Sequence, residues 1–137
     1  MSQEKLIRAI QNNNIDEVKN LIESKKADPN QPDKQGNMPL HGAYGEERLE
    51  IAKFLIENGA DIHQPNNLGD TPLHAACDSG RTETANFLIE KGADIDQPNN
   101  SGQTSLHVAC HSKRTEIAKL LMKHGADVNK PDNIGWT

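Results

Sequence analysis

The chain has 137 residues and a formal net charge of −5, and only 34% of its residues are apolar and 3% aromatic. One rounded core needs more large apolar side chains than this, whereas an elongated array needs only a narrow core shared between neighbouring units. The acidic balance argues against nucleic-acid binding, and no apolar run approaches the roughly 20 residues of a membrane span. The first residues lack the pattern of a secretory signal, so we expect an intracellular, most simply cytoplasmic, protein.

Glycine marks a repeat of 33 residues. Residues 66–98 laid over residues 99–131 without a gap give 18 identities in 33 positions. Leu, Ile, Val and Ala recur with the same period, which excludes a disordered chain. The repeating glycines fall in two columns, Gly36, Gly69, Gly102 and Gly135, then Gly59, Gly92 and Gly125.

Residues 1–32 are predicted to form an N-terminal capping repeat. Lys19 and Glu23 occupy columns that are apolar in later repeats, as a water-facing end requires. Lys26 stands where the later repeats carry a glycine that stops the second helix. The apolar columns align Val18, Leu21 and Ile22 with Ile51, Phe54 and Leu55.

Residues 33–65 form the least regular repeat. Met38 replaces a threonine, and Gly42 and Gly45 fall within the expected first helix, where each interior glycine costs about 1 kcal/mol. Tyr44 stands where later repeats have cysteine. These departures are explained either by selection for function or by sequence drift.

Residues 66–98 show the unit most clearly. Asn66 to Gly69 form a turn, and Thr71 followed by Pro72 begins a helix through a hydroxyl cap and a favourable first position. A break at residues 79–80 precedes a second helix from about Glu83, which Gly92 ends. The pattern predicts turn, helix, turn, helix and loop.

Residues 99–131 repeat this unit, and residues 132–137 begin another. Because the last residues have no polar cap, we expect these 137 residues to be a fragment of a longer protein. A natural stop at Thr137 is the alternative, and a natural mass near 15.1 kDa would support it.

The chain closely resembles the ankyrin-repeat family, whose signature is T-P-L-H-x-A with a period of 33. The resemblance implies an all-α solenoid of stacked helix-turn-helix repeats with β-turn fingers, in one domain spanning residues 1–137. The residues that carry it are Thr71-Pro72-Leu73-His74-Ala75-Ala76, with related segments at 38–43 and 104–109, and the G-A-D segments at 59–61, 92–94 and 125–127.

Three groups of residues suggest chemistry, but each has a structural explanation. His41, His74 and His107 recur one repeat apart, about 8–10 Å between stacked helices, whereas zinc holds nitrogen ligands at about 2.0–2.1 Å. The resemblance implies that these histidines link neighbouring repeats. Cys77 and Cys110 are too far apart for a disulfide on the same argument, and we expect both to be buried.

A ladder of glutamates is the third group. One glutamate falls in the first turn of each second helix, where it complements the helix dipole, and arginines beside three of them are expected to be solvated. Every candidate catalytic group recurs from repeat to repeat, whereas an active site needs one unique set of groups. We therefore expect no enzyme activity, metal or cofactor. The ladder comprises Glu17, Glu50, Glu83 and Glu116, with Arg48, Arg81 and Arg114.

The resemblance implies that a protein partner lies in the concave groove formed by turn tips and first helices. Acidic residues there favour a basic or polar segment. Trp136 is either an exposed anchor or the buried start of a further repeat. The predicted binding residues are Lys34, Gln35, Asn37, Tyr44, Glu46, Asn67, Leu68, Asp70, Asp78, Ser79, Asn100, Ser101, Gln103, His111, Ser112 and Trp136.

Asn129 resembles the ankyrin asparagine that an asparaginyl hydroxylase modifies, although His63 and Asp96 fill the same column. The leading hypothesis is a non-enzymatic protein-interaction module, with no nucleic acid or membrane as partner. One alternative is the recognition part of a larger enzyme or secreted effector, delivered to a host cell, whose catalytic domain lies beyond residue 137. The other is a spacer without a ligand. We expect a monomer whose uncapped C-terminal end is able to self-associate.

Overall fold

The computed structural model describes residues 2–34, 36, 38–43 and 48–132, and its regular elements there are all helical. Short helices pair into antiparallel hairpins, as the repeat predicts. The elements are α1 (Ser2–Gln11), α2 (Ile15–Glu23), the 3-10 turn η1 (Leu40–Gly42), α3 (Leu49–Glu57), α4 (Pro72–Ser79), α5 (Thr82–Glu90), α6 (Ser105–His111) and α7 (Thr115–Lys123).

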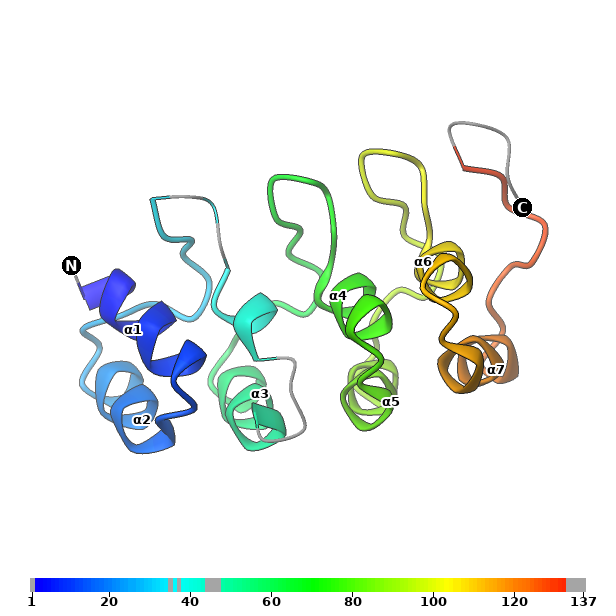
Figure 1. The fold of residues 1–137 in the computed structure, drawn as a ribbon. Coiled ribbons are helices and arrows are strands. Elements are labelled where there is room, and N and C mark those ends of the chain that lie inside the picture. The colour runs from blue at the N-terminus through cyan, green and yellow to red at the C-terminus, as the bar shows by residue number, and fades with distance from the viewer. Residues whose placement is uncertain (1, 35, 37, 44–47, 133–137) are drawn as a thin grey trace.

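The hairpins stand side by side in one row (Figure 1). The first helical elements α1, η1, α4 and α6 form one layer, the second helices α2, α3, α5 and α7 form the other, and the connecting turns project beyond the first layer. Each hairpin packs on its neighbours along the row, with α4 against α6 and α5 against α7. The fold is therefore an all-α solenoid rather than one rounded core. In the described part of the chain, no helix is long and apolar enough to cross a membrane.

Threonine caps begin the regular first helices. The Thr71 hydroxyl accepts a hydrogen bond from the His74 backbone N–H at 3.3 Å, and the His74 Nδ1 accepts one from the Thr71 backbone N–H at 3.1 Å. Thr104 and His107 repeat this reciprocal arrangement at the start of α6. Because the caps satisfy two of the otherwise free donors at the helix start, they favour the start of each helix at these threonines.

A residue of positive φ follows shortly after the end of each second helix. In the first repeat this residue is not the one expected from the alignment. Gly92 has a φ of +95°, and its N–H donates to the Ile89 carbonyl. Lys25 has a φ of +60°, and its N–H donates to the Ile22 carbonyl. Lys25, not Lys26, therefore replaces the stop glycine. The first repeat contains one additional residue after its second helix, so that Leu21 is equivalent to Leu55 and not to Phe54. Lys19 and Glu23 are then equivalent to Lys53 and Glu57, so the expectation that they replace apolar residues is wrong for the second repeat.

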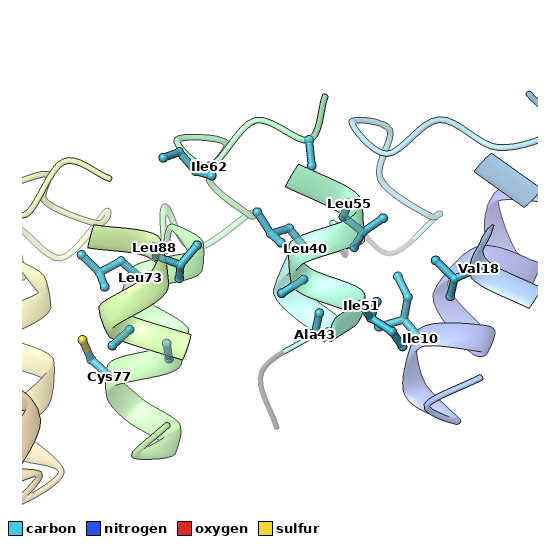
Figure 2. Packing of buried hydrophobic residues seen from close by; sticks show 14 of the residues in the cluster. Ile10, Val18, Leu40, Ala43, Ile51, Leu55, Ile62, Leu73, Cys77 and Leu88 are labelled. Atoms are coloured by element: carbon cyan, nitrogen blue, oxygen red, sulfur yellow. The ribbon is translucent and has the colours of Figure 1, made fainter. Parts of the chain in front are cut away.

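The core is a thin layer between successive hairpins (Figure 2). Leu55, Leu73 and Leu88 are at most 1% exposed, and alanines such as Ala76 let the helices approach closely. Each repeat supplies a few apolar side chains to a cluster that runs along the array. This arrangement explains how a chain with so few large apolar residues folds.

The repeat at 33–65 departs from its neighbours in structure as well as in sequence. Its first helix is reduced to the turn η1 within residues 38–43, whereas α4 and α6 have eight and seven residues. Gly42 packs against Ile10 of α1, since a Cβ at Gly42 would lie 3.1 Å from an Ile10 methyl carbon. At Gly42, close packing between repeats therefore favours the smallest residue.

Candidate functional site

Asparagines shape the turn tips, residues 66–70 and 99–103. The Asn66 Oδ1 accepts hydrogen bonds from the N–H groups of Leu68 and Asp70 at 2.9 and 3.1 Å. The Asn99 Oδ1 does the same for Ser101 and Gln103 at 2.9 and 3.0 Å. Because the asparagine carboxamide supplies the turn's internal bonds, side chains at the apex of each tip, such as Leu68 and Ser101, are left exposed.

Hydrogen bonds hold neighbouring tips at a fixed separation. The Asn100 backbone N–H donates to the Leu68 carbonyl at 3.0 Å, and the Asn100 side-chain amide donates to the Asn67 carbonyl at 3.0 Å. The Asn99 Nδ2 donates to the Asp70 carboxylate at 2.9 Å. The tips therefore form a rigid surface along which exposed residues occur at regular intervals.

The repeated histidines also link repeats. The His74 Nδ1 accepts from the Thr71 N–H, so its Nε2 carries the proton and donates to the Gln103 carbonyl at 2.8 Å. The His41 Nε2 lies 2.6 Å from the Asp70 carbonyl, in the equivalent place one repeat earlier. The linking role that the resemblance implied is confirmed for these two histidines.

A pocket of about 370 Å³ lies between α4 and α6. Its lining comes from the tips and from both first helices, which are far apart in sequence. The structure thus brings together six of the predicted binding residues: Asp70, Asp78, Ser79, Gln103, His111 and Ser112.

Two carboxylates give this pocket its acidic character. The exposed Asp78 accepts a hydrogen bond from the Ser112 hydroxyl at 2.7 Å, and the half-buried Asp70 is held by Asn99. The donors that position both carboxylates, an amide and a hydroxyl, are neutral. Asn99 also lines the pocket, although it is not among the predicted binding residues.

Other predicted residues lie at the tips, outside this pocket. Leu68 is 67% exposed, unusually high for a leucine. Lys34, Asn67, Asn100 and Ser101 are also exposed. The structure does not describe Gln35, Asn37, Tyr44, Glu46 and Trp136, so the predictions for these five residues lie outside the described residues.

Comparison with known proteins agrees with this architecture. The family model for ankyrin repeats, in three copies, matches residues 3–66 and 62–132. The chain belongs to the ankyrin-repeat family. Ankyrin repeats are typically non-enzymatic protein-interaction modules. The chain is also similar to the palmitoyltransferase akr1 of Schizosaccharomyces pombe, with 43% identity over 54 residues. That match spans 39% of this chain and 8% of the yeast protein, so it shows no catalysis in the ankyrin repeats described here.

The two cysteines of the ankyrin array differ in burial. Cys77 is fully buried between α4 and α6, and this burial raises the pKa of its thiol to about 12. Cys110 occupies the same column but is exposed, so the expectation that both are buried is wrong for Cys110. The local sequences are similar, but in the described part of the chain a following hairpin covers only Cys77.

Two arginines of the ankyrin repeats bond to backbone and are not simply solvated, which corrects the expectation. The Arg48 guanidinium donates to the carbonyls of Gln11 and Gly42 at 2.8 and 3.2 Å. The Arg114 Nε donates to the Asp78 carbonyl at 3.2 Å. Both therefore link one repeat to the end of the preceding first helical segment.

The glutamate ladder lies as expected, one residue in the first turn of each second helix: Glu17, Glu50, Glu83 and Glu116.

Asn129 is exposed after α7, and its backbone N–H donates to the Asp127 carboxylate at 2.9 Å. The same turn recurs at Asp96 and His63. In the first ankyrin repeat, Asn30 fills this column and bonds the Asp61 N–H and the Gly59 carbonyl of the next repeat. Asparagine in this column therefore has a structural role where another repeat follows.

We expect acid to destabilise the array through its linking histidines. Burial lowers the pKa of His41 and His74 below the ordinary 6.5, although the bonded carbonyls and nearby Asp70 oppose this shift. The unfolded chain therefore takes up protons first. Their contribution to stability is complete above pH 6.5 and is lost as pH falls below it, with a slope of at most about 1.4 kcal/mol per pH unit for each histidine.

Urea unfolding of wild type at pH 7, 6 and 5 measures this dependence. A His74→Gln variant should be less stable at pH 7 but should show a flatter pH profile than wild type. His63→Gln is the matched control, because His63 is exposed. The same pH slope in wild type and His74→Gln would contradict the assignment to His74.

Proposed function

We propose that this array binds a protein partner through its concave surface, formed by the turn tips and first helices. The observation that carries the proposal is the pocket between α4 and α6. Six residues selected from sequence alone, from four separate segments, line this one pocket of about 370 Å³. Such a pocket is suited to a side chain of a partner that lies along the tips.

Charge supports a basic or polar segment as the ligand. Asp70 and Asp78 line the pocket, and the chain as a whole carries a net charge of −5. Arg114 Nε bonds the Asp78 backbone carbonyl, and among the contacts described the Asp78 carboxylate accepts from the Ser112 hydroxyl. Aromatic residues make up only 3% of the chain, so we expect modest affinity.

Reversing the pocket's charge tests the proposal. A partner is first captured by affinity purification with the wild-type array. The Asp70→Arg/Asp78→Arg variant should bind this partner at least about tenfold more weakly, since like charges across an interface oppose association. Wild-type binding should also weaken as salt is raised. The control is Glu23→Arg/Glu57→Arg, which makes the same charge change at exposed residues of the second helices. Affinity should be measured by calorimetry at two salt concentrations.

Equal recovery of every partner by wild type and the Asp70→Arg/Asp78→Arg variant would exclude binding in this groove and favour a structural spacer. Binding that does not respond to salt would exclude the electrostatic contribution while leaving the groove as the site.

A second proposal is that the array is the recognition part of a larger enzyme or secreted effector. It is supported by the similarity to 54 residues of the palmitoyltransferase akr1, a protein of which this match is only 8%. The mass of the natural protein and the reading frame after Thr137 decide between the two. A natural mass near 15.1 kDa would exclude this second proposal.

We also propose an intracellular setting, with Asn129 as a candidate hydroxylation site. Cys77 and Cys110 are both free thiols, as is usual in a reducing compartment. Asn129 is exposed and so is accessible to a modifying enzyme. Mass spectrometry should find one added oxygen on Asn129 of protein isolated from cells that contain an asparaginyl hydroxylase. An unmodified Asn129 in such cells would exclude the modification.

A further inference from the structure

The pocket between α4 and α6 extends along the whole length of α4. Asp70 precedes the Thr71 cap of this helix and Asp78 lies in its last turn, and both acidic residues line the pocket. α4 has eight residues, so the helical rise separates Asp70 from Asp78 by on the order of 10 Å along the helix axis. The two negative charges therefore lie at opposite ends of one elongated pocket.

The donors that hold these carboxylates also lie at opposite ends of α6. The Asn99 side-chain amide, which donates to Asp70 at 2.9 Å, belongs to the turn tip before this helix. The Ser112 hydroxyl, which donates to Asp78 at 2.7 Å, belongs to the residue that follows it. Since the whole of α6 separates the two donors, each carboxylate is held at its own end of the pocket. A single cationic group therefore reaches only one of them.

The hydrogen bonds within the pocket use donors and leave acceptors. The Asn99 Nδ2 donates to the Asp70 carboxylate and to the Gln103 Oε1, at 2.9 and 3.4 Å. The Ser112 hydroxyl has one proton and donates it to Asp78. A carboxylate accepts several hydrogen bonds, so each has further acceptor capacity. None of the described residues that line the pocket is a lysine or an arginine, so both ends suit a cationic donor.

The middle of the pocket is apolar. Ala75 of α4 and Val108 of α6, both half-buried, line it between the two ends. The buried His74 also lines it, but its two ring nitrogens are bonded to the Thr71 N–H and the Gln103 carbonyl. Lysine and arginine side chains pack their hydrocarbon stems on such a surface while their charged groups remain at its polar edge.

We propose that the ligand of this pocket is a segment of the partner with two basic side chains, one bonded to Asp70 and the other to Asp78. The inference rests on the proposed function and adds to it the number and the spacing of the charges. In an extended chain, residues four apart lie on the same face at about 13 Å, which long side chains adjust to the spacing of the carboxylates. Adjacent residues point to opposite faces, so only one of them enters the pocket. The segment thus runs beside α4 and α6, while the rest of the partner lies along the tips.

Two peptides of the same composition and net charge test the spacing. In the spaced peptide two arginines are separated by three alanines, and in the adjacent peptide the arginines follow one another. Each peptide should be titrated into the isotope-labelled full chain at low salt and followed by nuclear magnetic resonance. The spaced peptide should bind at least about threefold more tightly, because only it brings a guanidinium to each carboxylate. Amide resonances at both ends of α4 should shift with it.

Neutral variants assign each arginine to one carboxylate. Asp70→Asn and Asp78→Asn remove the charge but keep an oxygen that accepts from Asn99 or Ser112. Replacing one arginine of the spaced peptide with alanine should weaken binding to wild type at least about twofold. The same replacement should have no effect in the variant that lacks the carboxylate of that arginine. Glu57→Gln, a neutral change at an exposed residue of α3, is the control and should leave every affinity unchanged.

Three results would overturn the inference. They are equal affinity for the two peptides, coupling of both arginines to the same carboxylate, and no binding of the spaced peptide at millimolar concentration. Each would leave the groove as a site for the captured partner. The proposed function fails separately, when Asp70→Arg/Asp78→Arg binds that partner as tightly as wild type does.

Discussion

Replacing Gly69 with alanine should destabilise the array by about 2–5 kcal/mol, the sum of a left-handed backbone penalty and an overpacking cost. Gly69 has a φ of +78°, and an added Cβ would lie 2.6 Å from the backbone nitrogen of Asn100. That nitrogen is held in place because its N–H donates to the Leu68 carbonyl. The new methyl group would therefore force two neighbouring tips apart.

Gly92→Ala is the matched control for this substitution. Gly92 also has a positive φ, +95°, but an added Cβ would have no atom within 4 Å. It should cost only the backbone penalty, about 1–2 kcal/mol. Urea unfolding of both variants measures the difference, which reports the close approach of the tips. Equal destabilisation by the two substitutions would show that the tips separate freely.

Replacing Leu88 with alanine should cost about 2–5 kcal/mol, the usual range for a buried leucine. Leu88 is 1% exposed in α5, in the centre of the row, and belongs to the core cluster. Since each hairpin is stabilised only by its immediate neighbours, the loss should be felt in α4, α5 and α6 together. Hydrogen exchange should show faster amide exchange in these three helices than in α1.

Leu68→Ala removes the same atoms from an exposed tip and is the control for Leu88→Ala. It should change the free energy of unfolding by no more than about 0.5 kcal/mol, because Leu68 is 67% exposed. Any effect of Leu68→Ala on partner binding would then reflect a direct contact. A Leu68→Ala variant as unstable as Leu88→Ala would contradict the assignment of the core.

The proposed binding surface could be selected from sequence to the extent that it lies in columns that vary between repeats. Asp78 and His111 differ at the same place in successive first helices, and this variation marked them as ligand-binding candidates. Asn99 escaped prediction because it repeats Asn66 and was therefore assigned to the turn, although it both shapes the turn and holds Asp70. A residue with two roles cannot be recognised from a pattern that separates scaffold from variable positions.

The first repeat shows a limit of column alignment. A constant period of 33 placed the stop position at Lys26, whereas the chain turns at Lys25, with a φ of +60°. The backbone hydrogen bonds at the end of the helix decide where it stops, and they tolerate one additional residue in the loop. The sequence itself contains the shift, because Lys19, Leu21, Ile22 and Glu23 are identical to Lys53, Leu55, Ile56 and Glu57 at a spacing of 34.

Sequence alone determined the family, the period, the start of each capped helix and the identity of the core columns. These follow from local chemistry: a threonine hydroxyl caps a helix wherever the right residues follow it, and apolar spacing defines one face. Only the tertiary structure decided which equivalent residues are buried. Cys77 and Cys110 have nearly the same neighbours in sequence, yet one is inaccessible and the other exposed, because burial in a stacked array depends on the hairpin that comes next.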